Sequence, residues 1–220
     1  MCIRDRYKNS SGTEANDQPT ADVDGKAIYV YKAIPTVSKN TLSSGFANGS
    51  ASYLYSFDVA APETGAVGLQ KITYTVGWST TTGNSMSIGS LKLYRGTTEL
   101  LDSGEATTTV SSVTTGATSL VFTFPTGETI GAGETYTYKL KGTPALFGKS
   151  SSTLIADSIS FYLEEDAAYV ASATSGATAV TAKNFVWSDV SALNHSVSTA
   201  DWTGGYKVGD LPLDADSWSY

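Results

Sequence analysis

The feature that most constrains the fold is an alternation of apolar and polar residues that recurs along the chain. It appears in Tyr53–Val59, Ile72–Trp78, Leu120–Phe124, Tyr136–Leu140 and Ile159–Leu163. Successive side chains of a β-strand point to opposite faces, whereas a helix with 3.6 residues per turn cannot produce a period of two. Each segment therefore has one apolar face that must be buried against another sheet. The pattern predicts an all-β chain.

Three further segments complete the set of expected strands: Ala27–Ile34, Leu91–Arg95 and Phe185–Trp187. Ala27–Ile34 is apolar on both faces, and we expect it to be the first strand, leaving an interdomain junction. Gly96–Glu99 has the glycine-led composition of a hairpin turn. Many short strands separated by turns predict an antiparallel β-sandwich of the immunoglobulin-like, Greek-key type.

The chain divides into four parts by composition. Residues 1–6 resemble a translated sequencing adapter, so we interpret them as an artefact and expect the native start to lie upstream. Residues 7–25 are polar and are expected to be a linker or the end of a preceding module. We predict the sandwich over residues 26–189. Residues 190–220 are expected to pack on it or to lead to the next module.

Charge and cysteine content narrow the class of protein. The formal net charge is −7, and no basic cluster accompanies it, so nucleic acid is not an expected partner. No apolar run reaches the roughly 18 residues of a membrane-spanning helix. The only cysteine, Cys2, lies in the adapter-like segment. Outside that segment the chain has no cysteine, is acidic and is rich in serine and threonine, which suits an extracellular or cell-envelope location.

The sequence contains few of the residues that catalysis usually requires. Its single histidine, His195, lies in the same loop region as Ser188 and Asp189, and we expect it to be a solvated loop residue. Nucleophile-elbow, phosphate-binding and zinc-ligand patterns are absent. We therefore expect a protein that is not an enzyme and that has no cofactor other than calcium.

Two acidic stretches are the candidates for calcium ligands, because Ca²⁺ prefers several hard oxygen atoms from a flexible loop. The first contains Asp102 and Glu105, and the second contains Glu164, Glu165 and Asp166. Neither has the residue spacing of an EF-hand loop. The alternative is that these carboxylates are solvated residues in turns.

A cross-link between side chains is a second candidate feature. Lys32 shares the strand phase of Val30 and Ile34, which directs it toward the core in the expected first strand. Asn184 opens the last strand and Asp189 ends it, so an amide bond between Lys32 and Asn184, promoted by Asp189, is one hypothesis. The alternative is that the ammonium group of Lys32 reaches water.

Aromatic side chains provide the third candidate. The chain has four tryptophans, and most of them lie on the apolar phase of their strands, which favours the core. Trp202 and Tyr206, in the stretch after the last expected strand, are the candidates for stacking against a sugar ring.

Several stretches near the start and the end of the expected sandwich have a distinctive sequence. The opening stretches are Tyr31–Val37, Phe57–Val59 and Val67–Leu69, and the later ones are Gly131–Leu140, Asn184–Asp189, Ala200–Tyr206 and Leu211–Pro212. Together they resemble β-sandwich modules in giant surface proteins of ultra-small, uncultivated bacteria. Such proteins are similar to surface-layer and adhesin-like stalks. The resemblance implies a role in the cell envelope and brings no catalytic residues.

These observations lead to two functional expectations. The first is a structural or spacer module of a bacterial surface protein, whose partners are neighbouring modules of the same chain. The alternative is a carbohydrate- or protein-binding module of a secreted protein, with glycans or other surface proteins as partners. The position of the tryptophans discriminates between them, since a sugar-binding platform requires exposed, coplanar rings.

Overall fold

The computed structural model describes residues 7–8, 14–15, 30–43, 45–81, 83, 85–151, 155–168, 176–180, 182–206 and 208–220. The chain forms two compact units, residues 1–30 and 31–220. In the first unit, β1 (Tyr7–Lys8) pairs antiparallel with β2 (Glu14–Ala15). The adapter-like residues 1–6 and most of the expected linker lie outside the described residues.

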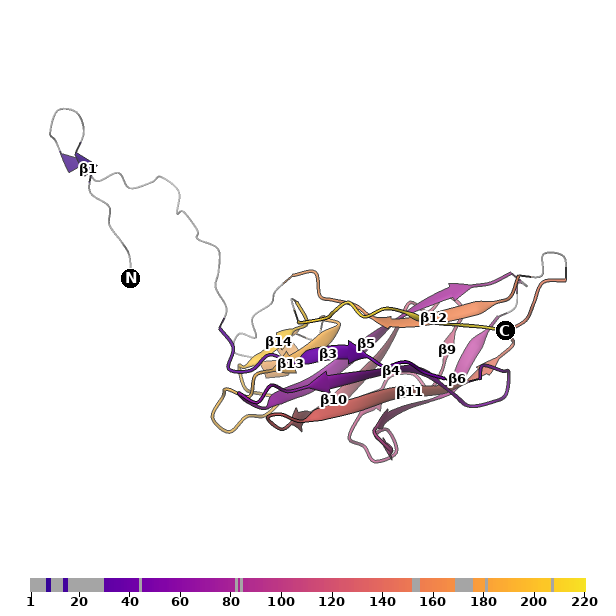
Figure 1. Ribbon diagram of the computed structural model, residues 1–220, viewed down its shortest axis with the longest axis horizontal. Coiled ribbons are helices and arrows are strands. Elements are labelled where there is room, and N and C mark those ends of the chain that lie inside the picture. The colour runs from indigo at the N-terminus through magenta and orange to yellow at the C-terminus, as the bar shows by residue number, and fades with distance from the viewer. Residues whose placement is uncertain are drawn as a thin grey trace. The chain divides into compact units, whose positions relative to one another are not determined.

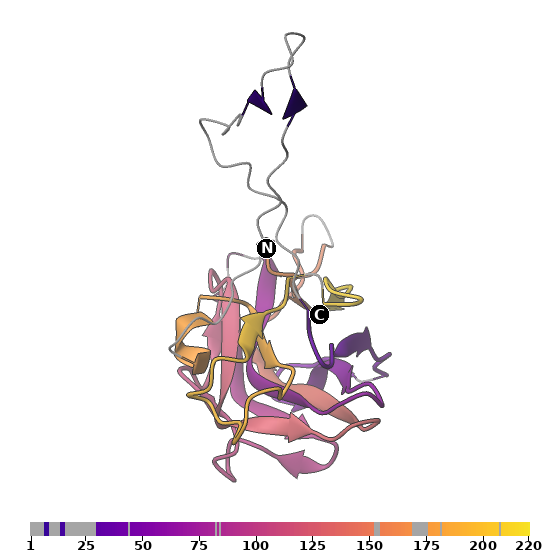
Figure 2. The same ribbon diagram turned by 90° about the vertical axis from the view of Figure 1, so that its left-hand side faces the viewer.

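The second unit is a β-sandwich, which confirms the fold class expected from the alternating pattern (Figures 1 and 2). One sheet has seven strands: β5 (Val67–Ser79), β8 (Thr107–Thr108), β10 (Ser119–Ile130), β12 (Ser158–Leu163), β13 (Phe185–Ser188), β14 (Trp202–Gly204) and β15 (Asp216–Ser219). The other has six: β3 (Thr36–Lys39), β4 (Ser52–Ala60), β6 (Ser87–Arg95), β7 (Thr98–Glu99), β9 (Val113–Thr114) and β11 (Thr135–Ala145). All strand pairs among the described residues are antiparallel.

Strand β5 organises the seven-stranded sheet because it is long enough to pair with three other strands. One of its edges pairs with β10. The other edge is shared: β13 pairs with the first half of β5, from Gly68 to Ile72, and β12 pairs with the second half, from Tyr74 to Ser79. The six-stranded sheet is built around β11, which lies between β4 and β6.

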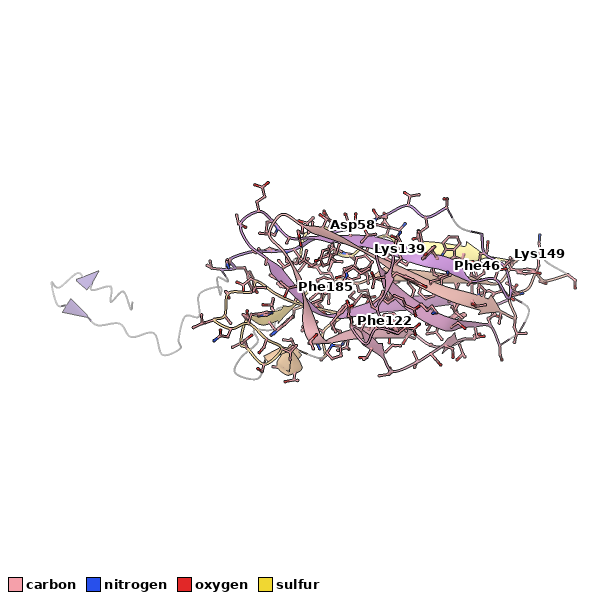
Figure 3. All side chains as sticks on the ribbon, turned by 90° about the horizontal axis from the view of Figure 1, so that it is seen from below. Phe46, Asp58, Phe122, Lys139, Lys149 and Phe185 are labelled. Atoms are coloured by element: carbon pink, nitrogen blue, oxygen red, sulfur yellow. The ribbon has the colours of Figure 1, made fainter. Side chains whose placement is uncertain are left out.

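The core lies between the two sheets, where the apolar phases of the alternating strands meet (Figure 3). Its largest fully buried side chains in the main cluster are Tyr55, Phe57, Tyr74, Phe122, Phe124, Tyr138, Phe161 and Phe185. Aromatic rings from both sheets touch: the centroids of Tyr55 and Tyr74 are 5.7 Å apart, and those of Phe124 and Tyr138 are 6.0 Å apart. The expected hairpin is also present, with Arg95 opposite Thr98 across the turn.

The expected first strand is the main error in the sequence-based assignment. Residues 30–35 form no strand, and β3 begins at Thr36, after Pro35. Residues 27–29 lie outside the described part. The inward-facing phase is also opposite to the expected one, because Ala33 and Val37 are buried whereas Ile34 is 47% exposed. Apolar residues on both faces left the phase undetermined by pattern alone.

The residues after position 189 contribute to the second unit rather than standing apart from it. Strand β14 pairs with β13, and β15 pairs with β12. A 3-10 helix, η1 (Gly176–Val180), packs near β14. No helix in the described part of the chain is long and apolar enough to cross a membrane.

Candidate functional site

A cavity of about 200 Å³ opens where the pairing of β10 with β5 is interrupted. The register shifts between Thr123 and Glu128, so the intervening residues bulge out of the sheet. Gly127 adopts a φ of +71°, which a residue with a side chain rarely adopts. The bulge leaves Glu128 facing inward, in the same phase as Ile130, and this carboxylate lines the cavity.

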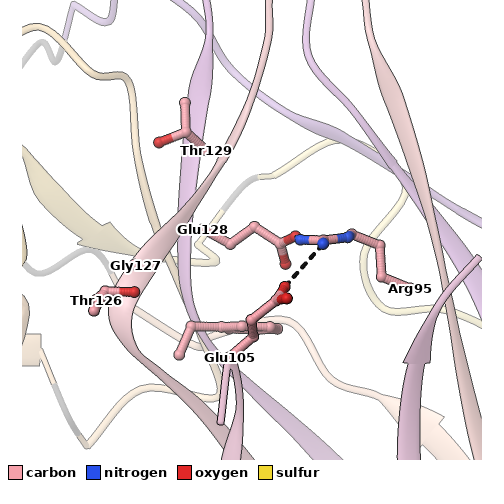
Figure 4. Close-up of a pocket in the computed structure, with 7 residues that line it drawn as sticks. Arg95, Glu105, Thr126, Gly127, Glu128 and Thr129 are labelled. Carbon is pink, nitrogen blue, oxygen red and sulfur yellow. Dashed lines mark hydrogen bonds and ion pairs between the residues drawn. The ribbon is translucent and has the colours of Figure 1, made fainter. Parts of the chain in front are cut away.

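Arg95 lies between two carboxylates in this cavity (Figure 4). Its Nη1 contacts Oε1 of Glu128, and its Nη2 lies 2.8 Å from Oε2 of Glu105. Glu128 is almost fully buried, whereas Glu105 is largely exposed. The guanidinium also lies over the ring of Tyr136, 5.5 Å from its centroid. Arg95 therefore links the inner face of β6 to the inner face of β10.

The second oxygen of Glu128 is also occupied. The hydroxyl of Tyr138 donates to Oε2 of Glu128 over 2.5 Å. Burial, and then the adjacent negative charge of Glu128, hold the pKa of Tyr138 well above its usual value. The hydrogen bond with Glu128 raises the pKa of Arg95 as well. Both oxygens of a buried carboxylate thus have strong donors, the condition under which such a charge is tolerated inside a protein.

This arrangement stabilises the two sheets relative to each other rather than presenting a reactive group. One guanidinium bridges both acids, so neither carboxylate has the isolated environment that separates a general acid from a general base. The cavity is also smaller than the 300–1,000 Å³ typical of small-molecule sites. We interpret Arg95, Glu105 and Glu128 as a polar cluster that joins the two sheets at the edge of the sandwich, and we call it the Arg95 lock.

The sequence contains a signal for this lock in the phase of two charged residues. Arg95 continues the inward phase of Leu91 and Leu93, and Glu128 shares the phase of Ile130. A charged residue on an apolar phase predicts a buried partner of opposite charge. Which residue supplies that partner depends on the bulge in β10, and the alternation pattern does not encode it.

The structure distributes the five calcium candidates over separate contacts. Asp102 lies 3.5 Å from the ammonium of Lys92, and Glu105 belongs to the Arg95 lock. Glu164 accepts a hydrogen bond from the hydroxyl of Tyr162, and Glu165 is half-buried. Among the described residues, no three His, Cys, Asp or Glu side chains are grouped closely enough to hold one metal ion.

Asp166, the fifth candidate, is buried and binds backbone N–H groups instead. Its Oδ1 accepts from the N–H of Asn184 at 2.8 Å, and its Oδ2 accepts from Gly205 at 2.7 Å and from Phe185 at 3.4 Å. This carboxylate therefore joins the segment after β12 to the start of β13 and the end of β14.

Two of the three cross-link candidates are close together, but not through the expected side chain. The backbone N–H of Lys32 donates to Oδ2 of Asp189 over 2.9 Å. The side chain of Lys32 is exposed, which contradicts the inward orientation that the cross-link hypothesis required and fits the alternative that its ammonium group reaches water. Asn184 is held at Asp166 instead. The structure does not bring the Lys32 ammonium, Asn184 and Asp189 together.

Trp202 is buried rather than exposed for sugar stacking, so the proposed platform with the half-buried Tyr206 is wrong. Its indole N–H donates to the carbonyl of Ser196 over 2.8 Å. A Cβ added at Gly68 would lie 3.1 Å from its ring, so β5 can approach this tryptophan closely only at a glycine. Trp202 forms a small second core on the outer face of the seven-stranded sheet.

His195 is not the solvated residue that the sequence suggested. Its side chain is 14% exposed, its ring lies against that of Trp202, and its Nδ1 is 2.8 Å from Oδ2 of Asp201. The pKa of Asp201 lies below its usual value. Burial alone would raise this pKa, but the opposite effect of hydrogen bonds from Thr199, Ala192 and Ser188, together with the charge of His195, is larger. Ser188 and His195 both contact the carboxylate of Asp201. A catalytic serine–histidine pair would instead require a direct contact between the serine hydroxyl and the imidazole.

No protein-family model matches this sequence, and no curated protein matches it.

Proposed function

We propose that this chain is a structural spacer module of a secreted bacterial surface protein and that it performs no catalysis. The observation that carries the proposal is the position of the two ends of the sandwich. The ring of Tyr31, at the upstream end, lies 5.0 Å from that of Trp187, which pairs with Leu69 of β5. At the downstream end, Ser219 pairs with Ser158, and Ser158 pairs with Ser79 of β5.

These contacts place the two ends at opposite ends of β5 (Figure 1). Ten residues of strand separate Leu69 from Ser79, which corresponds to roughly 33 Å. A module that the chain enters at one end and leaves at the other can be joined in series and adds its full length to a stalk. Force along such a stalk would act parallel to the terminal strands β3 and β15.

The tryptophans favour this proposal over a sugar-binding platform. All four indole N–H groups donate to backbone carbonyls of the same sandwich: Trp78 to Ala117, Trp187 to Gly204, Trp202 to Ser196 and Trp218 to Leu54. The acceptor distances are 2.8–2.9 Å. Rings fixed in this way serve the packing of the module.

Single-molecule pulling tests the proposal. In one variant, Lys32→Cys and Tyr220→Cys provide handles at the two ends, with Cys2→Ser to remove the other thiol. The control keeps Lys32→Cys and pairs it with Leu193→Cys. Leu193 is 90% exposed and lies two residues before His195, whose ring approaches Gly68 at the upstream end of β5. Pulling between the ends loads the hydrogen bonds of β3 and β15 together. Pulling on the control should separate β3 from β4, and β13 from β5, one hydrogen bond at a time.

We expect the end-to-end variant to unfold at a clearly higher force than the control at the same loading rate. A spacer module selected to transmit tension should resist load along its own axis. Equal forces in the two directions, or a lower force between the ends, would contradict a load-bearing role.

A further inference from the structure

The outer face of the six-stranded sheet carries a group of lysine and tyrosine side chains. Lys139 and Lys141 alternate along β11 with Tyr138 and Leu140, which are buried in the core, so the two lysines lie on the outer face. The neighbouring strands add Tyr53 from β4 and Lys92 and Tyr94 from β6. We call these five residues the lysine–tyrosine face.

The strand register places these side chains in two adjacent rows. Tyr53, Lys141 and Lys92 are directly opposite one another across β4, β11 and β6. In the next row, Lys139 is opposite Tyr94. Directly opposed residues on one face of a sheet are close enough for their side chains to interact. The face is therefore a contiguous surface formed by three central strands.

Aromatic rings hold the ammonium groups of this face in place without neutralising them. The Nζ atoms of Lys141 and Lys139 lie 5.3 and 5.7 Å from the ring centroid of Tyr53, and that of Lys141 lies 5.9 Å from the centroid of Tyr94. A cation–π contact attracts the ammonium group but brings no negative charge. Two positive charges are therefore positioned over one pair of rings.

Of the three lysines of this face, only Lys92 is paired with carboxylates. Lys92 lies 2.6 Å from Glu99 and 3.5 Å from Asp102. Lys139 and Lys141 form no ion pair with any residue in the described part of the chain. In a protein of net charge −7, a local concentration of unpaired positive charge is an exception to the overall field. Such a surface is complementary to an anionic ligand.

We propose that the lysine–tyrosine face binds an anionic polysaccharide whose sugars carry carboxylates. Ammonium groups pair with the carboxylates of the chain, and tyrosine rings pack against the apolar C–H faces of the sugars. Lys139 and Lys141 are two residues apart on β11, so roughly 7 Å separates their backbone positions. Their charges can engage acidic sugars of one extended polysaccharide chain that lies along β11 on the outer face of the sheet.

Other anionic ligands fit this surface less well. Strand β11 has hydrogen-bonded neighbours on both sides, so a peptide cannot bind by adding a strand there. Nucleic acid derives its affinity from many phosphate contacts, and the two unpaired lysines of this face provide few. The inference goes beyond the spacer function and does not depend on it, because it rests on the sheet face rather than on the ends of the sandwich.

Titration calorimetry with oligomers of polygalacturonate tests the proposal on the full chain. The test variant combines Lys139→Gln with Lys141→Gln. The matched control combines Lys32→Gln with Lys149→Gln, which removes the same charge at two exposed positions elsewhere. A third variant, Tyr94→Leu, keeps the charges and removes one ring. Thermal unfolding of each variant establishes that the fold is retained.

We expect the wild-type chain and the matched control to bind with similar affinity, and the Lys139/Lys141 variant to bind at least about tenfold more weakly. Tyr94→Leu should weaken binding while preserving its dependence on salt, and a neutral galactan should not bind. Any of four outcomes would overturn the proposal: no binding by the wild type at low salt, equal losses in both double variants, equally tight binding of duplex DNA, or a change in oligomeric state as the main effect of the Lys139/Lys141 substitutions.

Discussion

Two tyrosines that touch in the core differ in how their hydroxyl groups are satisfied. The hydroxyl of Tyr55 donates to the carbonyl of Asp214 over 2.9 Å. The hydroxyl of Tyr74 is buried and has no hydrogen-bond partner among the described residues. Burial raises the pKa of both side chains. A buried polar group without a partner costs free energy, whereas a paired one adds to stability.

Replacing each of these tyrosines with phenylalanine should therefore change stability in different directions. We expect Tyr74→Phe to leave the free energy of unfolding unchanged or to raise it by up to about 1 kcal/mol, because an unsatisfied hydroxyl is removed. Tyr55→Phe should lower it by about 1 kcal/mol. Urea denaturation of both variants measures the difference. A loss of equal size in both would indicate that Tyr74 has a hydrogen-bond partner.

The Arg95–Glu128 pair should behave as a coupled unit. Arg95→Ala leaves a buried carboxylate without its cation, and we expect it to lower the free energy of unfolding by about 3 kcal/mol. Adding Glu128→Gln should recover part of that loss, and a double-mutant cycle measures the recovery. Lys92→Ala, which breaks a more exposed pair, serves as the control and should cost less than about 1 kcal/mol. Additive effects of the two core substitutions would refute the coupling.

At the scale of single residues, the sequence indicated which residue types would be buried but did not indicate which side chains they would contact. The outward orientation of Lys32 could not be derived, because Ala27–Ile34 is apolar on both faces. The burial of His195 and Trp202 depends on close approach to Gly68, which lies more than a hundred residues earlier in the chain. Local patterns do not report such distant contacts.

At the scale of elements, the alternating segments were predicted well because the apolar residues of each share one face almost throughout. The exception is Tyr53, which a register shift between β4 and β11 places on the outer face, opposite Lys141. Strands β4, β5, β10, β11 and β12 contain the five segments identified from the period of two. The shorter strands lack that signal: β3, for example, has only one buried apolar residue, Val37. Such strands owe their conformation to the neighbouring strand rather than to their own sequence.

Strand β15 illustrates how a short edge strand contributes to stability. It pairs with β12, and its side chains also reach the other sheet: Asp216 forms an ion pair with Lys39 at 2.6 Å, and the indole of Trp218 donates to the carbonyl of Leu54. It thus joins the two sheets along one side of the sandwich.

Removing residues 215–220 should lower the free energy of unfolding by about 3 kcal/mol, through lost hydrogen bonds and the exposure of apolar surface. It should also promote aggregation, because the edge of β12 becomes available for pairing. Urea denaturation and light scattering measure the two effects. Deletion of Tyr220 alone is the control and should have a small effect. An unchanged midpoint in the longer deletion would show that β15 is dispensable.

At the scale of the whole molecule, the main core is one continuous cluster that includes residues of both sheets. The aromatic contacts run from Phe122 through Tyr74 and Phe57 to Tyr138 and Phe124. A single core of this kind favours cooperative unfolding, so a chemical change at one buried group affects the stability of the entire sandwich.

The buried tyrosines predict a loss of stability at alkaline pH. Burial raises the pKa of Tyr55, Tyr74 and Tyr138 above the unfolded value of about 10. Below that pH both states keep these protons, and stability does not depend on them. Above it the unfolded state releases protons that the folded state retains, so each tyrosine lowers stability by up to about 1.4 kcal/mol per pH unit.

Urea denaturation between neutral pH and pH 11 measures this slope, and the range above pH 10 is the informative one. The Tyr74→Phe variant should show a smaller slope than the wild type, since it has one fewer buried phenol. Stability that stays constant above pH 10 would refute the expected retention of protons in the core.

The shared edge of β5 has a consequence for how this sandwich tolerates changes in chain length. Strands β12 and β13 run in the same direction along that edge, and Leu163 and Phe185 lie opposite Tyr74 and Ile72, only two positions apart on β5. The chain thus leaves this edge of β5 after Leu163 and rejoins it at Phe185, where Asp166 accepts from the N–H groups of Asn184 and Phe185. The entropic cost of closing a loop grows slowly with its length, by about 0.6 kcal/mol for each doubling. Foreign sequence inserted between Asp166 and η1 should therefore leave the register of both strands intact, whereas an insertion within η1 would disturb its buried residues Ala177 and Val180. The gap between β12 and β13 is therefore the position at which this module should best tolerate an inserted sequence.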